Sequence, residues 1–403
     1  MDAIKNPFVP GAGTPPPELA GRETLLQQAQ IALARVKRGT PAKSMILVGL
    51  RGVGKTVLLV RIKEEAEQAG FRVLLTEAHE GKSLPALLVP QLRSLLYALD
   101  IVANAKEKVR RGLRILRSFI GSIRISHSEI EYELGIDPEV GVADSGDFEA
   151  DLAALLVAVG EAAKAADTAV ALLIDELQYL SEKEFGALIM AVHRLNQERL
   201  PLVLIAAGLP QILALAGNSK SYAERLFDFP RVEALSEEAA REALVEPVEP
   251  FGVTFADEAL ATILAVTKRY PYFLQQWGYE AWNVSEGPRI DAADVERATG
   301  RALDALDESF FRVRFDRCTP SEKRYLRALA ELGPGPQKSG EIADILGVKV
   351  TTVAPVRAKL IQKGMIYSQQ HGDTAFTVPM FDDYMRRAMP GDDWKAKASL
   401  RRP

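Results

Sequence analysis

The sequence has few of the side chains that provide thiol, metal or nucleophile chemistry. It contains one cysteine, Cys318, and four scattered histidines among 403 residues. A single cysteine excludes a disulfide within the chain and fits a reducing cytosol, so we expect a cytoplasmic protein in which Cys318 is a small buried side chain. The histidines lack the spacing of a metal site, and no serine-hydrolase triad stands out.

A long uninterrupted apolar run is also missing. The most apolar stretch, 200–217, is broken by two prolines and by Gly208. A membrane-spanning helix needs about 20 consecutive apolar residues, and residues 1–7 show no apolar core of a signal peptide. We therefore expect no membrane segment.

What the sequence does contain is a phosphate-binding motif. Residues 49–56 read Gly-Leu-Arg-Gly-Val-Gly-Lys-Thr, which fits the pattern G-x-x-x-x-G-K-S/T. Glycines let the backbone wrap closely around phosphates, and successive N–H groups form a nest for an anion. An apolar strand at 45–48 and a helix from residue 57 supply the flanks that the motif requires. The motif predicts an ATP site in which Lys55 bridges the β- and γ-phosphates and Thr56 ligates Mg²⁺.

A pair of carboxylates gives the second chemical signal. Asp175 and Glu176 follow the fully apolar strand predicted at 169–174. Because buried carboxylates are costly unless a cation meets them, we expect Asp175 to hold Mg²⁺ through water and Glu176 to act as a general base on the attacking water. Phosphoryl transfer also uses an arginine, and Arg225 and Arg231 are candidates for a finger that reaches a neighbouring subunit of a homo-oligomer.

The periodicity along the chain predicts an α/β core. Apolar strands alternate with helical segments, and the strands are at 45–48, 73–75, 169–174 and 202–206. Strands that are apolar on both faces are typical of a parallel sheet with helices on both sides. The predicted domains are an ATPase core with an N-terminal arm at 1–235, an all-helical lid at 236–317, and a winged helix with a basic tail at 318–403.

Residues 78–148 look like an insertion between the second and third strands. Its segments at 84–99 and 105–120 have helical periodicity, and the second of them is basic and amphipathic. Alternating apolar residues between 123 and 134 predict a hairpin. The basic stripe fits a contact with nucleic acid or anionic lipid, or else a solvated face balanced by the acidic segment 129–151, which we favour.

The C-terminal end is basic and has the pattern of a DNA-binding module. Residues 319–403 carry 14 Lys and Arg against 9 Asp and Glu, a net charge of +5 in a chain of net charge −4. Short helices and a hairpin between 339 and 378 predict a winged helix-turn-helix.

The second helix of that module suits phosphates better than bases. Its outer face is poor in base-reading side chains, and only Gln362 suits a bidentate base contact. Cations suited to phosphates are at its flanks: Lys349, Arg357, Lys359 and Lys363. We therefore expect duplex DNA to bind with weak sequence preference. A module that binds protein partners is the alternative.

Five short segments together carry a family resemblance. They are Pro7-Phe8, Gly21-Arg22-Glu23, the loop 49–56, Leu173–Glu176 and Tyr270–Phe273. In these segments the chain resembles bacterial and archaeal AAA+ and STAND-type ATPases, which are relatives of the replication-initiator ATPases. The resemblance covers about residues 6–385. It implies an α/β P-loop sheet, a helical lid, a C-terminal winged helix, and hydrolysis of ATP with Mg²⁺.

The resemblance also implies roles for individual residues. It places Phe8, Gly21 and Arg22 near the adenine, and it brings Tyr270 and Pro271 of the lid over the nucleotide. The loop residues expected to bind the nucleotide are Gly49, Arg51, Gly52, Val53, Gly54, Lys55, Thr56 and Val57.

Two departures from the family pattern bear on the rate of hydrolysis. Residues 206–209 read Ala-Ala-Gly-Leu, without the Asn or Thr that is usual after the fourth strand. Residues 268–269 are Lys-Arg where many relatives carry a glycine, so no lid sensor arginine is assigned. Both departures favour a slow ATP-driven switch over a fast ATPase.

Overall fold

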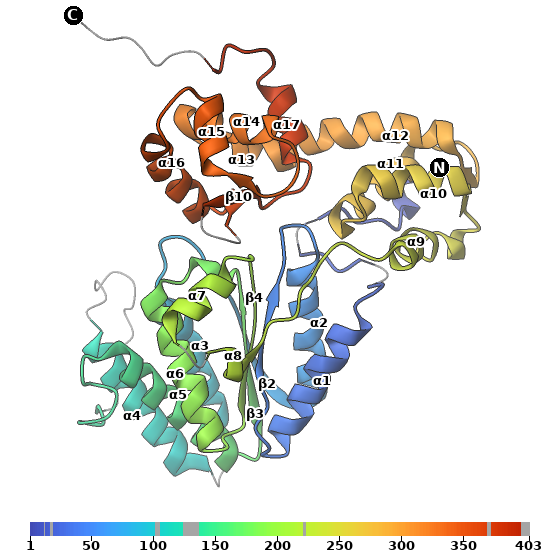
Figure 1. Cartoon of the computed structure of the whole chain (residues 1–403). Helices are drawn as coiled ribbons and strands as arrows, with labels where there is room; N and C mark the ends of the chain where they lie inside the picture. Colours follow the sequence, from blue (N-terminus) through green and yellow to red (C-terminus); the bar gives the residue numbers. More distant parts are fainter. Residues whose placement is uncertain are drawn as a thin grey trace, which may run out of the picture.

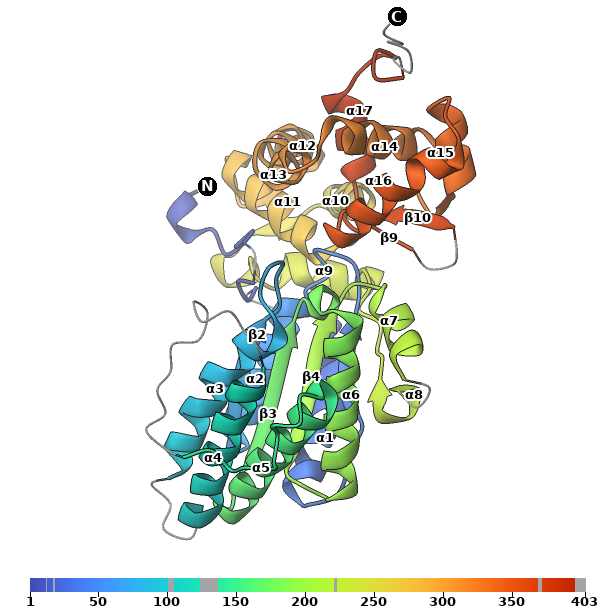
Figure 2. The same ribbon diagram turned by 90° about the vertical axis from the view of Figure 1, so that its left-hand side faces the viewer.

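The computed structural model describes residues 1–11, 13–16, 19–100, 105–123, 137–220, 223–368 and 372–395. Figure 1 shows an α/β core below and two helical parts above it, with the lid on the right and the C-terminal module on the left. In the perpendicular view of Figure 2 both upper parts lie over the same end of the sheet. Within the described ranges, no helix has the length and apolar character needed to cross a membrane.

A parallel sheet forms the centre of the core. Its strands are β1 (Ser44–Val48), β2 (Phe71–Glu77), β3 (Ala169–Asp175), β4 (Leu202–Gly208) and β5 (Phe227–Asp228). They pair in the order β2-β3-β4-β1-β5, and every pair is parallel. β1, β3 and β4 are buried along their whole length, because helices cover both faces. The predicted α/β P-loop fold is confirmed.

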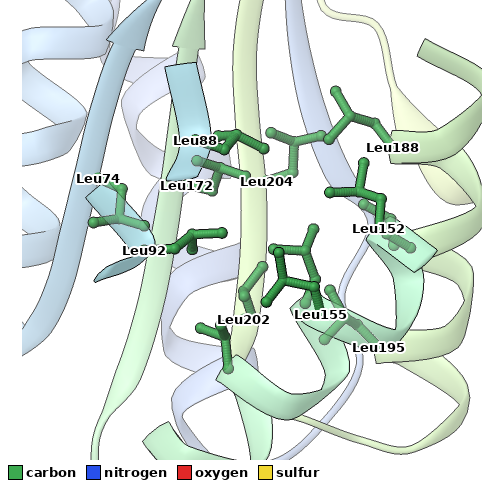
Figure 3. Close-up of a cluster of buried hydrophobic side chains, with 14 of the residues drawn as sticks. Leu74, Leu88, Leu92, Leu152, Leu155, Leu172, Leu188, Leu195, Leu202 and Leu204 are labelled. Atoms are coloured by element: carbon green, nitrogen blue, oxygen red, sulfur yellow. The ribbon is translucent and has the colours of Figure 1, made fainter. Parts of the chain in front are cut away.

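The helices divide between the two faces of the sheet (Figure 1). On one face lie α1 (Glu23–Lys37) and α2 (Lys55–Gln68), and on the other lie α3 (Leu84–Leu99), α5 (Phe148–Ala165) and α6 (Glu182–Gln197). Alternation along β1 sends Met45 and Leu47 into the core of the first face and Ile46 into that of the second. Figure 3 shows the second core, in which Leu172 and Leu204 of the sheet meet leucines of the covering helices.

The insertion contributes one further helix to the second face. α4 (Lys106–Ser122) packs on α5 and buries the apolar stripe that its sequence predicts. On its basic side, Arg111 and Arg114 pair with Glu139 at 2.9 and 3.0 Å. This pairing supports the balanced face rather than a nucleic-acid or lipid contact. The hairpin predicted at 123–134 lies, apart from Ile123, outside the described residues.

The lid and the module are built mainly from helices. In the core, β4 is followed by α7 (Ile212–Ser219), α8 (Ala223–Leu226) and β5, after which the chain enters the lid. The lid contains α9 (Glu237–Val245), α10 (Asp257–Thr267), α11 (Pro271–Val284), α12 (Ala292–Ala305), and the parallel pair β6 (Thr254–Phe255) and β7 (Arg289–Ile290). A π-helical turn, η5 (Leu306–Phe311), and α13 (Arg312–Asp316) continue from α12 into the module. Short 3₁₀ turns are η1 (Ala3–Lys5), η3 (Leu177–Tyr179) and η4 (Glu249–Phe251).

The C-terminal module combines four helices with a small sheet. The elements are α14 (Pro320–Glu331), β8 (Gln337–Lys338), α15 (Ser339–Ile345), α16 (Val350–Gln362), β9 (Ile366–Tyr367), β10 (Asp373–Phe376) and α17 (Phe381–Ala388). The strands pair antiparallel in the order β8-β10-β9. Trp277 of the lid and Phe381 of the module belong to one continuous hydrophobic cluster. The predicted boundary at 317/318 falls inside that shared core, and the winged-helix assignment stays a prediction.

Candidate nucleotide site

The loop between β1 and α2 is shaped by its glycines. Gly52 and Gly54 have φ angles of +82° and +91°, in the left-handed region that favours glycine. A Cβ on Gly49 would lie 2.2 Å from the carbonyl oxygen of Val232, so no larger residue fits there. α2 begins directly after Gly54 with no side-chain cap. Its first N–H groups therefore point at whatever anion the loop holds.

Lys55 lies across this loop in a buried position. Its Nζ donates to the carbonyl oxygens of Gly49 at 2.9 Å and Leu50 at 2.8 Å. Burial lowers the pKa of Lys55 to about 8, although the charges of Glu176 and Asp175 oppose the change. A buried cation whose direct partners are neutral carbonyls is well suited to an anionic ligand such as phosphate.

Thr56 and Asp175 bring two hard oxygen ligands together. The Thr56 hydroxyl donates to Oδ2 of Asp175 at 2.5 Å. Asp175 is buried at the end of β3, and this burial raises the pKa of its carboxyl. Because a buried carboxylate is stabilised by a cation, and Mg²⁺ prefers oxygen ligands, the two side chains suit a Mg²⁺ ion.

Glu176 has a strained backbone and two side-chain partners. Its φ of +52° lies in the left-handed region, which is costly for a residue with a Cβ and clusters at functional sites. Oε1 accepts from Nη1 of Arg51 at 3.1 Å, and Nε2 of Gln178 donates to Oε2. Oε1 of Gln178 accepts from the backbone N–H of Leu209 at 3.0 Å. Gln178 therefore provides a polar link at the end of β4, where the sequence itself lacks an Asn or Thr.

A cavity of about 390 Å³ opens between the loop, the N-terminal arm and the lid. Its polar end is formed by residues 51–57 and Glu176. Its apolar lining consists of Val9, Pro16, Leu19, Ala20, Leu235, Ala243, Pro271, Tyr272, Phe310 and Val313. The volume is in the range of small-molecule sites. An apolar slot beside a phosphate-binding loop matches the base and the phosphates of a nucleotide.

The structure places Phe8 differently from the expected contact with adenine. Phe8 is buried in the lid core, and a Cβ on Gly278 would lie 2.6 Å from its ring. Val9, the next residue along the arm, lines the cavity instead. The aromatic ring gains more from burial among apolar side chains than from a position at the cavity wall.

Only some of the other residues expected near the base line the cavity. Arg22 lines the cavity, but its Nη2 already donates to the carbonyl oxygen of Val53 at 3.0 Å. Among the described residues, Pro271 lines the cavity, and Gly21 and Tyr270 do not. Arg22 therefore holds the arm to the loop, and Pro271 covers the cavity.

The predicted finger arginines do not reach this cavity within the same chain. Arg225 in α8 is exposed, and Arg231 is exposed beside Glu233 at 3.9 Å. Their role toward a neighbouring subunit stays a prediction. The arginines among the described lining residues are Arg22, Arg51 and Arg314. No motif in the sequence points to Arg314, which lies in a helical segment.

The C-terminal module contacts the phosphate-binding loop directly. The backbone N–H of Arg51 donates to the carbonyl oxygen of Thr377 at 3.0 Å. Gly364 lies so close that a Cβ there would be 2.9 Å from Nη2 of Arg51. A second contact joins Arg317 to Glu80, beyond β2, at 3.5 Å. The nucleotide site and the module are therefore in physical contact.

Two family models match the sequence. Residues 18–205 match the model described as "AAA ATPase domain", and residues 308–385 match one described as "Domain of unknown function (DUF8462)". The first match contains the phosphate-binding loop and both carboxylates. The second begins in η5 and covers most of the C-terminal module. A search of curated proteins found no relative of this chain.

Solved structures of similar fold span most of the chain. A Walker-type ATPase of Pyrococcus abyssi is 16% identical, with a TM-score of 0.54 over 91% of this chain and 96% of that chain. The Aeropyrum pernix Orc1 protein in complex with DNA is 16% identical, with a TM-score of 0.47 over 92% and 94%. Cdc6p from Pyrobaculum aerophilum is 14% identical, with a TM-score of 0.47 over 96% and 97%. The first supports the fold alone, and the other two are too dissimilar to carry an argument.

Proposed function

We propose that this chain, an ATP-hydrolysing enzyme whose residues 18–205 form an AAA ATPase domain, works as a slow switch in which the C-terminal module responds to the nucleotide. The observation that carries the proposal is the position of Arg51. Its side chain pairs with Glu176, and its backbone N–H donates to Thr377 of the module. One residue therefore touches the proposed catalytic carboxylate and the module at the same time.

The geometry supports a division of roles around ATP. The phosphates lie on the loop, and the base lies against the apolar lining of the cavity. Lys55 turns its ammonium from the loop carbonyls to the phosphates, which are stronger partners. Thr56 and Asp175 would hold Mg²⁺, which neutralises phosphate charge when bound. Glu176 accepts a proton from the attacking water.

Hydrolysis is slow in this proposal because the carboxylate of Glu176 is held by two neighbouring side chains. Arg51 and Gln178 both bond to its carboxylate. Both oxygens of the carboxylate therefore already accept hydrogen bonds, which leaves it less available to take a proton from water. Any movement of the module that displaces Arg51 would release Glu176 for catalysis.

Two substitutions test the nucleotide site. Lys55→Ala should abolish tight ATP binding in calorimetry and leave the circular dichroism spectrum unchanged, because Lys55 contacts the ligand and is not part of an apolar core. Glu176→Gln should keep ATP bound and slow single-turnover hydrolysis by about 100-fold or more, since the amide keeps the shape and loses the base. A folded Lys55→Ala protein with normal ATP affinity would contradict the proposed ATP site.

We also propose duplex DNA as the partner of the module. The outer face of α16 is exposed at Thr351, Pro355, Ala358 and Gln362. Lys349 and Lys359 are exposed beside it, and the described residues offer neither of them an ion pair. Cations free at the flanks of a face poor in base readers support binding to phosphates with weak sequence preference.

The other two cations expected at that face are used inside the module. Nε of Arg357 donates to the Thr374 hydroxyl at 2.9 Å. Nζ of Lys363 pairs with Glu322 at 2.7 Å. Their contacts hold the hairpin and α14 in place, so we assign them a structural role and leave phosphate binding to Lys349 and Lys359.

A protein partner is the second candidate. Val350, at the start of α16, is 49% exposed, and a large apolar side chain there suits a protein surface better than DNA. Titration of the full-length protein with unrelated duplexes at two salt concentrations separates the candidates. DNA binding should weaken steeply with salt and depend little on sequence. No binding at low salt would favour the protein partner.

A further inference from the structure

A buried glutamine of the lid, Gln275, lines the cavity on the side away from the phosphate-binding loop. α11 begins at that loop, because the backbone N–H of Tyr272 donates to the carbonyl oxygen of Gly52 at 3.2 Å. Gln275 follows nearly one turn later, and Tyr272 and Gln275 both belong to the cavity lining. Since an α-helix rises about 1.5 Å per residue, Gln275 lies further from the loop and faces the apolar part of the cavity beside Val9.

The orientation of the Gln275 amide is fixed by the N-terminal arm. Its Oε1 accepts from the backbone N–H of Val9 at 3.1 Å. Because a backbone N–H can only donate, this bond determines which end of the amide carries the oxygen. The arm itself is held in place, since the Asn6 amide donates to the carbonyl oxygen of Tyr279 at 3.0 Å. The other end of the Gln275 amide therefore presents the two N–H groups of Nε2.

These two donors have no acceptor in the part of the chain that the structure describes. Only 9% of Gln275 is exposed, and its one hydrogen bond there is the contact with Val9. Nε2 is not one of the fully enclosed polar atoms, so it is accessible from the cavity. A buried donor that stays unpaired costs free energy, which an acceptor on a bound ligand would recover.

The neighbouring glutamine provides a contrast. Gln276 is similarly buried, but its Nε2 donates to Oε1 of Glu280 at 3.3 Å, and it is not part of the described lining. Gln275 therefore differs from Gln276 in having unused donors that face a cavity.

Two other polar side chains of the lining already use their donors within the protein. Nη2 of Arg22 donates to the carbonyl oxygens of Val53 and Glu233 at 3.0 and 2.7 Å. The hydroxyl of Ser309 donates to a carbonyl oxygen of its own helix at 2.6 Å. Gln275 therefore offers a base in the apolar part of the cavity a hydrogen-bond donor that needs no rearrangement.

We infer that Nε2 of Gln275 donates to a ring nitrogen of the adenine base. The inference rests on the proposed function, since it requires a nucleotide in this cavity. The unsubstituted ring nitrogens N1, N3 and N7 of adenine accept hydrogen bonds and carry no proton, so a group that only donates matches them. The same amide binds the arm through Oε1, so one side chain connects the base, the arm and the lid. ATP and ADP share the base and therefore use this contact equally.

Calorimetry on the full-length protein with ADP tests the contact without interference from hydrolysis. Gln275→Glu keeps an oxygen that accepts from Val9 and loses both donors, whereas Gln275→Leu loses the oxygen as well. Both variants should weaken ADP binding by about tenfold, the upper range for the loss of one hydrogen bond. Gln276→Leu is the matched control in the same helix and should bind ADP like the unmodified protein.

Three analogues of ADP identify the atom that Gln275 contacts. In 1-deaza-, 3-deaza- and 7-deaza-ADP, a C–H group replaces one ring nitrogen. One of them should bind the unmodified protein about three- to tenfold more weakly than ADP does, and Gln275→Leu should bind that analogue and ADP alike. Full affinity for all three analogues overturns the inference, also where the Gln275 variants fail to fold. A loss that persists unchanged in Gln275→Leu overturns it too. If 2′-deoxy-ADP shows the coupling instead, the amide binds the ribose and the contact with the base is wrong.

The outcomes separate this inference from the proposed function. Normal ADP affinity in both Gln275 variants overturns the inference, and the nucleotide site stands if Lys55→Ala still abolishes binding. If Lys55→Ala binds ADP normally, the nucleotide site itself is wrong.

Discussion

Arg51 is the residue that connects the proposed catalytic carboxylate of Glu176 to its surroundings. It pairs with Glu176 at 3.1 Å, and its Nη2 donates to the Tyr179 hydroxyl at 3.0 Å. Only 19% of the Arg51 side chain and 18% of the Glu176 side chain are exposed. At this degree of burial, solvent screens the pair less than it screens a surface ion pair. The pair therefore has enough strength to control the availability of Glu176.

We expect Arg51→Ala to raise the basal rate of ATP hydrolysis by roughly fivefold, because Glu176 is then free to act as a base. This increase corresponds to an activation free energy lowered by about 1 kcal/mol. Phosphate release at saturating ATP measures the effect. Tyr179→Phe removes one hydrogen bond to Arg51 and keeps the ion pair, so its increase should be smaller. A slower Arg51→Ala enzyme with unchanged ATP affinity would mean that Arg51 stabilises the transition state instead.

Cys318 is a second residue whose surroundings predict a measurable property. It is 6% exposed, and its Sγ donates to the carbonyl oxygen of Arg314 at 3.4 Å. Burial raises the pKa of the Cys318 thiol to about 11 from an ordinary value of 9.0. At pH 8 the reactive thiolate should therefore be about 100-fold rarer than in a free cysteine.

We expect iodoacetamide to label Cys318 only after unfolding. The same shift sets a pH dependence of stability: between pH 9 and pH 11 the unfolded thiol loses its proton and the folded thiol keeps it. The unfolded state then binds fewer protons, so the free energy of unfolding falls as pH rises through this window. Labelling of the native protein at pH 8 as fast as that of a small thiol would contradict the burial.

At the scale of elements, the N-terminal arm is a component of the lid. The Asn6 amide donates to the carbonyl oxygen of Tyr279 and to Oδ1 of Asn283, both at 3.0 Å. Phe8 then packs its ring against α11 at Gly278, where a Cβ would lie 2.6 Å from a ring carbon. The arm therefore depends on a glycine that helix propensity alone would disfavour.

Gly278→Ala should lower the thermal midpoint of unfolding by roughly 2 °C or more, because overpacking costs about 1–3 kcal/mol and exceeds the gain in helix propensity. Gly300→Ala is the matched control in the neighbouring helix α12, since nothing lies within 4 Å of its added Cβ. It should instead stabilise the chain by about 0.5–1 kcal/mol. Equal shifts for the two variants in calorimetric scans would rule out the contact with Phe8.

The same elements show what local signals in the sequence can predict. α3 has the bounds that its periodicity indicates, and it begins at the cap Ser83. α4 runs from Lys106 to Ser122, close to the predicted 105–120. The pairing of Glu176 with Arg51 could not be predicted, since Arg51 is 125 residues away along the chain. Only the packing of the loop against β3 brings them together, and Arg314 likewise reaches the cavity through tertiary packing.

At the scale of the whole molecule, the module presents one face to the core and another to solvent. β9, β10 and the segments beside them lie at the phosphate-binding loop, where Thr377 accepts from Arg51. α16 lies on the outer side of the module in Figure 1. A partner bound to α16 would therefore not cover the contact between the module and the loop. The partner and the nucleotide can then act on the module at the same time.

Replacement of Lys349 and Lys359 by alanine together should weaken binding to every duplex by a similar factor. The slope of log affinity against log salt should fall by about 2, because each phosphate contact contributes about one. Fluorescence anisotropy with several duplexes measures both quantities. Arg357→Ala serves as the comparison and should act mainly on the thermal stability of the module. A strong preference for one duplex, controlled by Gln362, would show that the face reads sequence.

The path of the chain restricts how the lid opens. The polypeptide passes between core and lid twice, once in the arm after Phe8 and once in the segment 229–236, where Leu235 N–H donates to the Arg269 carbonyl at 3.0 Å. A rigid body joined at two points rotates about the axis through them and resists other rotations. The contact between Arg51 and Thr377 adds a third point, away from both crossings. We therefore expect the breaking of that contact to be the principal barrier to the exchange of ADP for ATP, so that exchange follows a single exponential.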